Sequence, residues 1–153
     1  MNTQRHRLDG IRRRFAAVAL AAVALAISSC GNGDGRKPVF PVTGRVLFEG
    51  KPADKALVIF HPVGESGPAV IRPRGQVGPD GTFTLATYGT ADGAPAGTYQ
   101  VTVELWLAST RKGEDDRPPL NRLPVRYSKP GSSGLHVQIE PRPNELKAFE
   151  LKR

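Results

Sequence analysis

The residues of this 153-residue chain that could do chemistry are few and widely separated. Beyond the first thirty residues the histidines are His61 and His136. Neither has the spacing to cysteine, histidine or acid that a zinc site uses, and neither accompanies a recognisable nucleophile. We therefore interpret both as surface residues, and we predict no catalytic residue, no metal and no cofactor.

Four aspartates could in principle hold calcium. Asp80 and Asp92 each precede a glycine, and Asp115 and Asp116 lie in a charged, proline-rich stretch. A calcium loop needs several acids at alternate positions, which this chain lacks. Because aspartate before glycine is typical of turns, the turn interpretation is sufficient for Asp80 and Asp92.

The chain has a single tryptophan, Trp106, in a strand-like run just before the charged stretch. We expect it to be buried in a central strand, as large aromatic side chains usually are. In the alternative interpretation, Trp106 forms a stacking platform with Tyr88 and Tyr127, and this platform contacts a sugar or a peptide.

Cys30 is the only cysteine, so no intramolecular disulfide can form. It follows an arginine-rich start and an uninterrupted apolar run, residues 15–27, which together are typical of an export signal. Arg12-Arg13 leaves both the general and the twin-arginine export routes open. Ile27-Ser28-Ser29-Cys30 resembles the bacterial lipobox, in which the cysteine thiol is lipidated and becomes the new N-terminus.

We therefore predict that residues 1–29 are a helical lipoprotein signal peptide and that lipid on Cys30 anchors the exported chain in a membrane. The anchored domain would lie at the periplasmic face or the cell surface. Residues 30–41 are rich in glycine and proline and are expected to form a flexible tether.

The net charge of +8 gives little support for nucleic-acid binding. The leader contributes roughly half of this excess, and the remaining cations form no basic stripe. Phosphate binding needs cations clustered on one face. We therefore predict that the partners include no nucleic acid.

The elements that position these residues are strands. Residues 78–103 hold two runs in which apolar and polar residues alternate, and turn residues bound each run. This period of two indicates half-buried strands of an antiparallel sheet. Similar runs are expected elsewhere: 42–48, 56–61, 69–71, 125–127, 135–140 and 146–151. Residues 108–124 are expected to be a long exposed loop, and residues 129–134 a turn.

From Val42 to Leu151 the chain resembles the carboxypeptidase regulatory-like domains. The similar motifs are VTGRVLFEGKPADKALVIFHP, GPDGTFTLATY and DGAPAGTYQVTV. LPVRYSKPGSSGLHVQI and NELKAFEL look like a family of small bacterial lipoproteins built on this domain. The resemblance implies an all-β domain over residues 42–153, a transthyretin-like (prealbumin-like) sandwich of about seven antiparallel strands in an Ig-like Greek key. It also implies an envelope accessory or binding module with no established activity.

The expected function is therefore that of a non-enzymatic cell-envelope lipoprotein that binds a partner of unknown identity, an envelope protein or a glycan. The alternative is a carbohydrate-binding domain that uses Trp106 and the nearby tyrosines.

Overall fold

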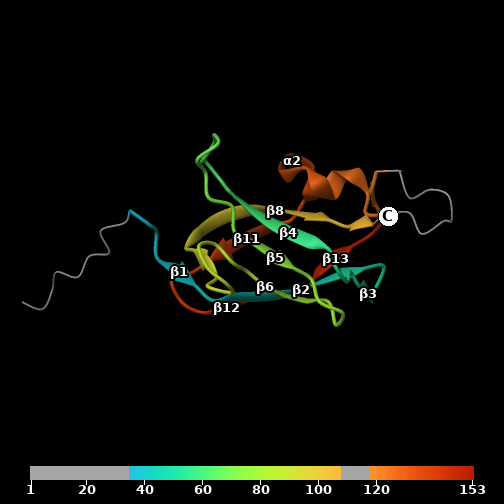
Figure 1. Ribbon diagram of the computed structural model, residues 1–153, viewed down its shortest axis with the longest axis horizontal. Coiled ribbons are helices and arrows are strands. Elements are labelled where there is room, and N and C mark those ends of the chain that lie inside the picture. Colours follow the sequence, from blue (N-terminus) through green and yellow to red (C-terminus); the bar gives the residue numbers. More distant parts are fainter. Residues whose placement is uncertain (1–34, 108–117) are drawn as a thin grey trace, which may run out of the picture. The chain divides into compact units, whose positions relative to one another are not determined.

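The computed structural model describes residues 35–107 and 118–153 (Figure 1). Lys37–Arg153 forms a compact unit. The expected signal peptide, Cys30, Asp115 and Asp116 lie outside the described residues. The described part is mostly β-structure, which confirms the all-β prediction.

The first sheet has four antiparallel strands in the order β11, β8, β4, β5. Their bounds are His136–Ile139 for β11, Gly97–Glu104 for β8, Leu57–Pro62 for β4 and Arg74–Gln76 for β5. The predicted alternation holds in β8, where Tyr99, Val101 and Val103 are buried on one face. In β4, Val58 and Phe60 are buried on the same side, so the core-facing positions of the two central strands match.

The second sheet is built around β2, Val42–Phe48. The antiparallel neighbours are β3, Lys51–Pro52, and β6, Thr82–Thr84. The parallel neighbours are β12, Asn144–Glu145, and β13, Phe149–Leu151. The prediction of a wholly antiparallel fold is therefore wrong for the last strands, because the chain returns along β2 in the same direction.

Two short pairs complete the sheet structure. β1, Val39–Phe40, pairs with β7, Ala94–Pro95. β9, Trp106–Leu107, pairs with β10, Leu120–Asn121. Strand pairing with the domain begins at Val39, within the stretch expected to form the tether.

The two larger sheets face each other across one hydrophobic core. Phe60 of the first sheet is fully buried, and its ring centroid lies 6.3 Å from that of Phe83 and 6.5 Å from that of Phe149, both from the second sheet. The Tyr99 ring lies 5.8 Å from Phe60 on the remaining side. This aromatic cluster joins the two sheets.

Three expected elements differ in the structure. Residues 125–127 form not an edge strand but part of a 3-10 helix, η1, Val125–Ser128, and the expected turn at 129–134 contains the helix α2, Pro130–Ser133. Proline at the first position favours a helix start, and Gly134 ends α2 in the left-handed conformation. Residues 69–71 form no strand, because Arg74–Gln76 occupies the edge of β4 instead.

Asp92 holds the loop between β6 and β7. Its carboxylate accepts backbone N–H bonds from Thr87 at 2.7 Å, Tyr88 at 3.0 Å and Gly89 at 2.9 Å. Partial burial alone would raise the pKa of Asp92, but these three donors outweigh it and hold the pKa below the ordinary value of 3.8. The turn interpretation of Asp92 is therefore confirmed.

Replacement of Asp92 with asparagine should lower the free energy of unfolding at pH 7 by about 1 kcal/mol, because the charge-assisted bonds are lost. A carboxylate whose pKa is lower in the folded state stabilises the fold above its unfolded-state pKa. That contribution disappears as the pH falls through the folded-state pKa. Urea unfolding of both proteins from pH 6 to pH 2 should therefore show that the free energy of unfolding falls less with pH for Asp92→Asn than for the original chain. Parallel curves would contradict this role.

Candidate functional site

Four exposed apolar side chains lie in the β9–β10 ribbon or shortly after it in the chain, in η1. Trp106 is 54% exposed, Leu120 62% and Val125 69%, and Leu107 also reaches the surface. Leu107 and Leu120 are paired and share one face of the ribbon, whereas Trp106, paired with Asn121, lies on the other face. Exposed apolar side chains gathered in one region are typical of interaction sites. We call Trp106, Leu107, Leu120 and Val125 together the ribbon end.

Asn121 holds the ribbon end together. Its side-chain Oδ1 accepts N–H bonds from Leu105 at 3.0 Å and from Leu123 at 3.1 Å. The Arg122 amide donates to the Leu105 carbonyl at 2.9 Å, so pairing continues beyond β9 and β10. These bonds connect the ribbon to β8 and position Trp106 beyond the last residue of that strand.

The prediction that Trp106 is buried is wrong. Strand β8 ends at Glu104, and Trp106 belongs to a two-stranded ribbon rather than to a central strand with both faces covered by described residues. The Trp106 Nε1–H donates to Glu104 Oε2 at 2.7 Å, which holds the indole against a carboxylate. The exposed indole face can stack on a flat ligand, and the carboxylate beside it can accept hydrogen bonds from that ligand.

The stacking platform of the alternative interpretation does not form from these three aromatic residues. Tyr127 is only 6% exposed, and its hydroxyl bonds to the backbone of Lys152. The Tyr88 hydroxyl accepts the Lys37 N–H at 3.1 Å, close to the start of β8. Because β8 is about 25 Å long at its eight residues, Tyr88 and Trp106 lie near opposite ends of the domain.

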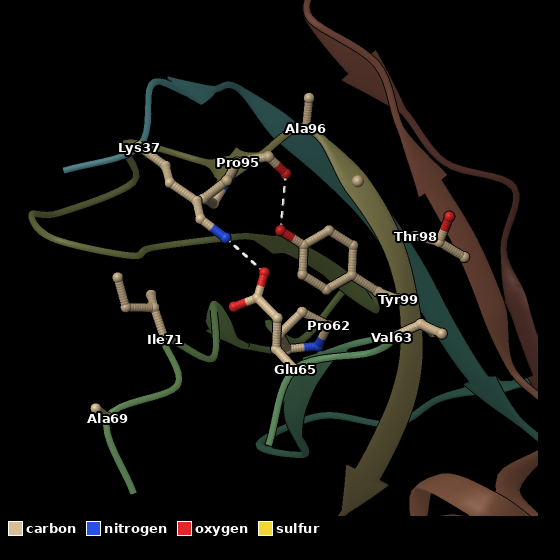
Figure 2. A pocket seen from close by; sticks show the side chains of 11 residues that line it. Lys37, Pro62, Val63, Glu65, Ala69, Ile71, Pro95, Ala96, Thr98 and Tyr99 are labelled. Carbon is tan, nitrogen blue, oxygen red and sulfur yellow. Dashed lines mark hydrogen bonds and ion pairs between the residues drawn. The ribbon is translucent and has the colours of Figure 1, made fainter. Parts of the chain in front are cut away.

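A small pocket of about 230 Å³ lies near the start of β8 (Figure 2). The Lys37 ammonium pairs with the Glu65 carboxylate across it, and the Tyr99 hydroxyl donates to the Pro95 carbonyl at 2.8 Å. Burial, and to a lesser extent Glu65, raises the pKa of Tyr99 to about 12. The Tyr99 phenol therefore stays protonated and hydrogen-bonded to the Pro95 carbonyl. The pocket is also smaller than most ligand-binding sites.

The histidines lie closer together than the sequence suggests. His61 and His136 are both paired with Gln100 of β8, one from each side, so they share a row on the sheet about 10 Å apart. His61 Nε2 lies 2.9 Å from Thr102 Oγ1. Burial and then the charge of Arg72 lower the pKa of His61. No ion pair joins either histidine to an acid within the described residues.

The described residues contain neither a cluster of metal-binding side chains nor a membrane-spanning helix. Across residues 35–107 and 118–153, no three side chains of the metal-binding types gather closely enough to hold an ion. In the same part of the chain, no helix has the length and hydropathy to span a membrane.

Comparisons with known proteins add little. No protein-family model matches the chain, and no curated protein matches its sequence. One similar solved structure is a 9R-lipoxygenase from Cyanothece PCC8801, with 14% identity and a TM-score of 0.36. The match covers 74% of this chain but only 16% of the lipoxygenase chain, and a TM-score of this size does not indicate a common fold.

Sequence reasoning singled out Trp106 but missed the other exposed apolar residues of the ribbon end. The available signal was their position, since Leu107 and Leu120 flank the charged, proline-rich stretch on either side. Residues close to such a stretch are less often covered by a second layer.

Proposed function

We propose that this chain is a non-enzymatic cell-envelope lipoprotein whose β-domain binds a partner protein through the ribbon end. The supporting observation is the group of exposed apolar side chains led by Trp106, at 54%, and Leu120, at 62%. Tryptophan is among the residues that contribute most to protein interfaces, and it does so when neighbouring apolar groups exclude water.

The anchor in this proposal is lipid on Cys30, after removal of residues 1–29. The lipobox-like Ile27-Ser28-Ser29-Cys30 supports it, as does the apolar run before it. More than one acyl chain gives stable membrane attachment, whereas one chain binds only marginally. The transthyretin-like topology belongs to the same proposal, and the two facing sheets are consistent with it.

A second candidate function is carbohydrate binding. The observation that favours it is the indole of Trp106, which is exposed on its face while its N–H is held by Glu104 at 2.7 Å. An orientated indole can stack on a sugar ring, and the carboxylate can accept hydroxyl donors. The tyrosines named from the sequence take no part in this candidate, because neither lies beside Trp106 with an open face.

Crosslinking in the native envelope tests the proposal. A photo-crosslinking residue at Leu120 should capture a defined protein, and the same residue at the exposed Val63 near the opposite end of β8 is the matched control. Trp106→Ala should reduce the capture at position 120 at least about tenfold, as expected for an interface hot spot. Cys30→Ala should move the chain from the membrane fraction to the soluble fraction.

Each result distinguishes the alternatives. A ribbon-end interface would be contradicted if the crosslinker captured the same amount of protein from positions 120 and 63. It would also be contradicted if Trp106→Ala left the amount captured at position 120 unchanged. If no protein is captured and the chain is instead retained on immobilised envelope glycan only when Trp106 is present, the carbohydrate function replaces the first proposal. A Cys30→Ala chain that stays in the membrane fraction would contradict the lipid anchor.

A further inference from the structure

We propose that a second copy of this chain docks along the open side of the domain, edge to edge through β11. The site is a groove of about 390 Å³ between residues 134–138 and residues 145–149. We call it the lateral groove. It runs between the outer strand of the first sheet and the last strands of the second sheet.

One wall of the lateral groove is an unpaired strand edge. β11 pairs with β8 on one side only. The Val101 amide donates to the Leu135 carbonyl at 2.9 Å, so the Leu135 carbonyl points toward β8. Successive residues of a strand direct their backbone groups to opposite sides. The N–H and C=O groups of His136 and Gln138 therefore face the groove.

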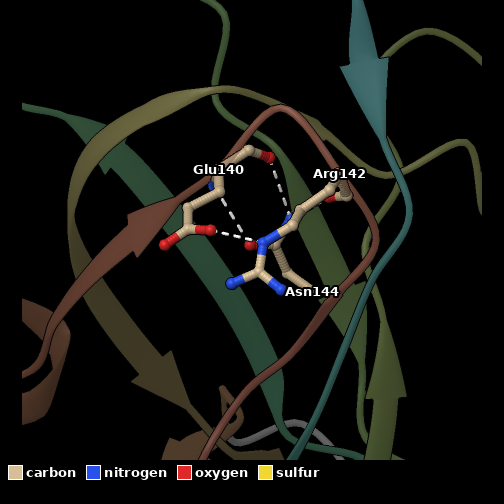
Figure 3. A network of polar contacts seen from close by, with 3 residues as sticks. All are labelled: Glu140, Arg142 and Asn144. Atoms are coloured by element: carbon tan, nitrogen blue, oxygen red, sulfur yellow. Dashed lines mark hydrogen bonds and ion pairs between the residues drawn. The ribbon is translucent and has the colours of Figure 1, made fainter.

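Glu140 is the next residue after His136 and Gln138 whose backbone groups face outward. These groups already have a hydrogen-bond partner within the protein (Figure 3). The Glu140 amide donates to Asn144 Oδ1 at 3.0 Å, and Asn144 Nδ2 donates to the Glu140 carbonyl at 3.1 Å. One carboxamide thus takes the place of a neighbouring strand. Within the described residues, the outward backbone groups of His136 and Gln138 have no such partner.

The opposite edge of the first sheet is treated differently. In β5, the Arg74 amide donates to the Ala86 carbonyl at 3.0 Å, and the Ala86 amide donates back at 2.8 Å. The β5 edge therefore already has a hydrogen-bonded neighbour in Ala86. β11 is short, but the strand HVQI contains no lysine, proline or acid, the residues that commonly protect an open edge. Such an edge favours pairing with another strand.

The second copy is the occupant that the geometry and the charges favour. A two-fold axis through Val137 sets His136 of one copy opposite Gln138 of the other, in an antiparallel ladder made by their outward backbone groups. The same contact covers Val137 and Leu146, which are only partly buried against the core in one copy.

The second sheet supplies the charge complementarity. Glu145 and Lys147 flank Leu146, both are exposed, and neither has an ion-pair partner in the described part of the chain. Residues 140–144 reverse the chain, so this segment runs back along β11 and lines the same groove. The two-fold axis then places Glu145 of each copy near Lys147 of the other. Opposite charges across paired edges stabilise the pair.

In the second sheet, the contact between the two copies is made by side chains rather than by backbone groups. Asn144 pairs with Val42, whereas Phe149 pairs with Val46, so the segment contains one residue more than β2 between these points. Such a bulge interrupts a continuous ladder. The backbone ladder is therefore assigned to β11, and the specificity to Glu145 and Lys147.

Sedimentation equilibrium of the full chain in density-matched detergent tests this proposal. Glu145→Lys and Lys147→Glu should each raise the dimer dissociation constant about tenfold, because each replaces two attractive pairs with two repulsive ones. The double variant Glu145→Lys/Lys147→Glu should restore the original value. Glu150→Lys and Lys152→Glu, with the same spacing outside the lateral groove, are the matched controls and should leave it unchanged.

A proline at position 138 tests the ladder separately. The Gln138 N–H faces the groove rather than β8, so Gln138→Pro should keep the folded circular dichroism spectrum and abolish the dimer. A chain that is monomeric at all concentrations would overturn the proposal. So would a dimer that tolerates both single charge reversals and Gln138→Pro.

Discussion

Replacing Gly93 with alanine is expected to lower the free energy of unfolding by roughly 3–5 kcal/mol, among the largest effects for a single methyl group. Gly93 has a φ of 95°, and a Cβ added there would lie 1.8 Å from the Phe40 carbonyl oxygen. It would also lie 2.4 Å from the Phe40 carbonyl carbon and 2.9 Å from the Cα of Pro41. These are backbone atoms, so no side-chain rotation relieves the clash.

The clash would separate β1 from β7. Phe40 pairs with Ala94, the residue directly after Gly93, and the Gly93 amide donates to the Leu85 carbonyl at 3.0 Å. Moving Phe40 away from Gly93 therefore breaks the pairing of β1 with β7, which holds the start of the domain in place. The positive φ adds about 1 kcal/mol or more for any residue with a Cβ.

Two other glycines serve as controls for the Gly93 experiment. An added Cβ meets nothing within 4 Å at Gly131 and has ordinary contacts, at 3.7 Å, at Gly89. Neither has the positive φ of Gly93. Urea unfolding should place Gly131→Ala and Gly89→Ala within about 1 kcal/mol of the original chain. A Gly93→Ala variant in the same range would show that Phe40 does not lie where the structure places it.

The core-facing strands could be predicted from the sequence because their faces are set by a period of two. In β8, Tyr99, Val101 and Val103 are all buried, as the alternation indicates. In β13, Phe149 and Leu151 are buried and Glu150 between them is exposed. Such runs need only local information, since each strand has one buried and one open face.

The candidate site depended on longer-range information. The burial of Trp106 was expected from a central strand with both faces covered, but Trp106 lies beyond the end of β8 and is 54% exposed. His61 and His136 are 75 positions apart in the sequence, yet both pair with Gln100. Which strand lies beside which is decided by the topology, and composition carries no signal for it.

Helices and parallel strands were missed for a similar reason. The valine and tyrosine of Val125–Ser128 favour a strand, but the adjacent prolines and Gly134 permit two short helical turns. The parallel pairing of β13 with β2 depends on the path of the chain after Ile139. A local pattern gives strand positions but not the direction of the neighbouring strand.

Phe60→Ala is expected to lower the free energy of unfolding by about 3–5 kcal/mol. Phe60 is fully buried at the centre of the aromatic cluster, and its ring lies between 5.8 and 6.5 Å from those of Tyr99, Phe83 and Phe149. These rings come from both sheets, so the cavity would open between the layers rather than at one edge. Because small domains are stable by only about 5–15 kcal/mol, most of the stability could be lost.

A graded pair of variants keeps this prediction measurable. Phe60→Leu retains much of the volume and should cost only about 1–2 kcal/mol, so it unfolds in an accessible urea range even if Phe60→Ala does not fold. Val63→Ala, just beyond the end of β4 and 54% exposed, should change stability by less than about 0.5 kcal/mol. A similar loss for Phe60→Leu and Val63→Ala would mean that Phe60 does not join the two sheets. The aromatic cluster would then not be the centre of the core.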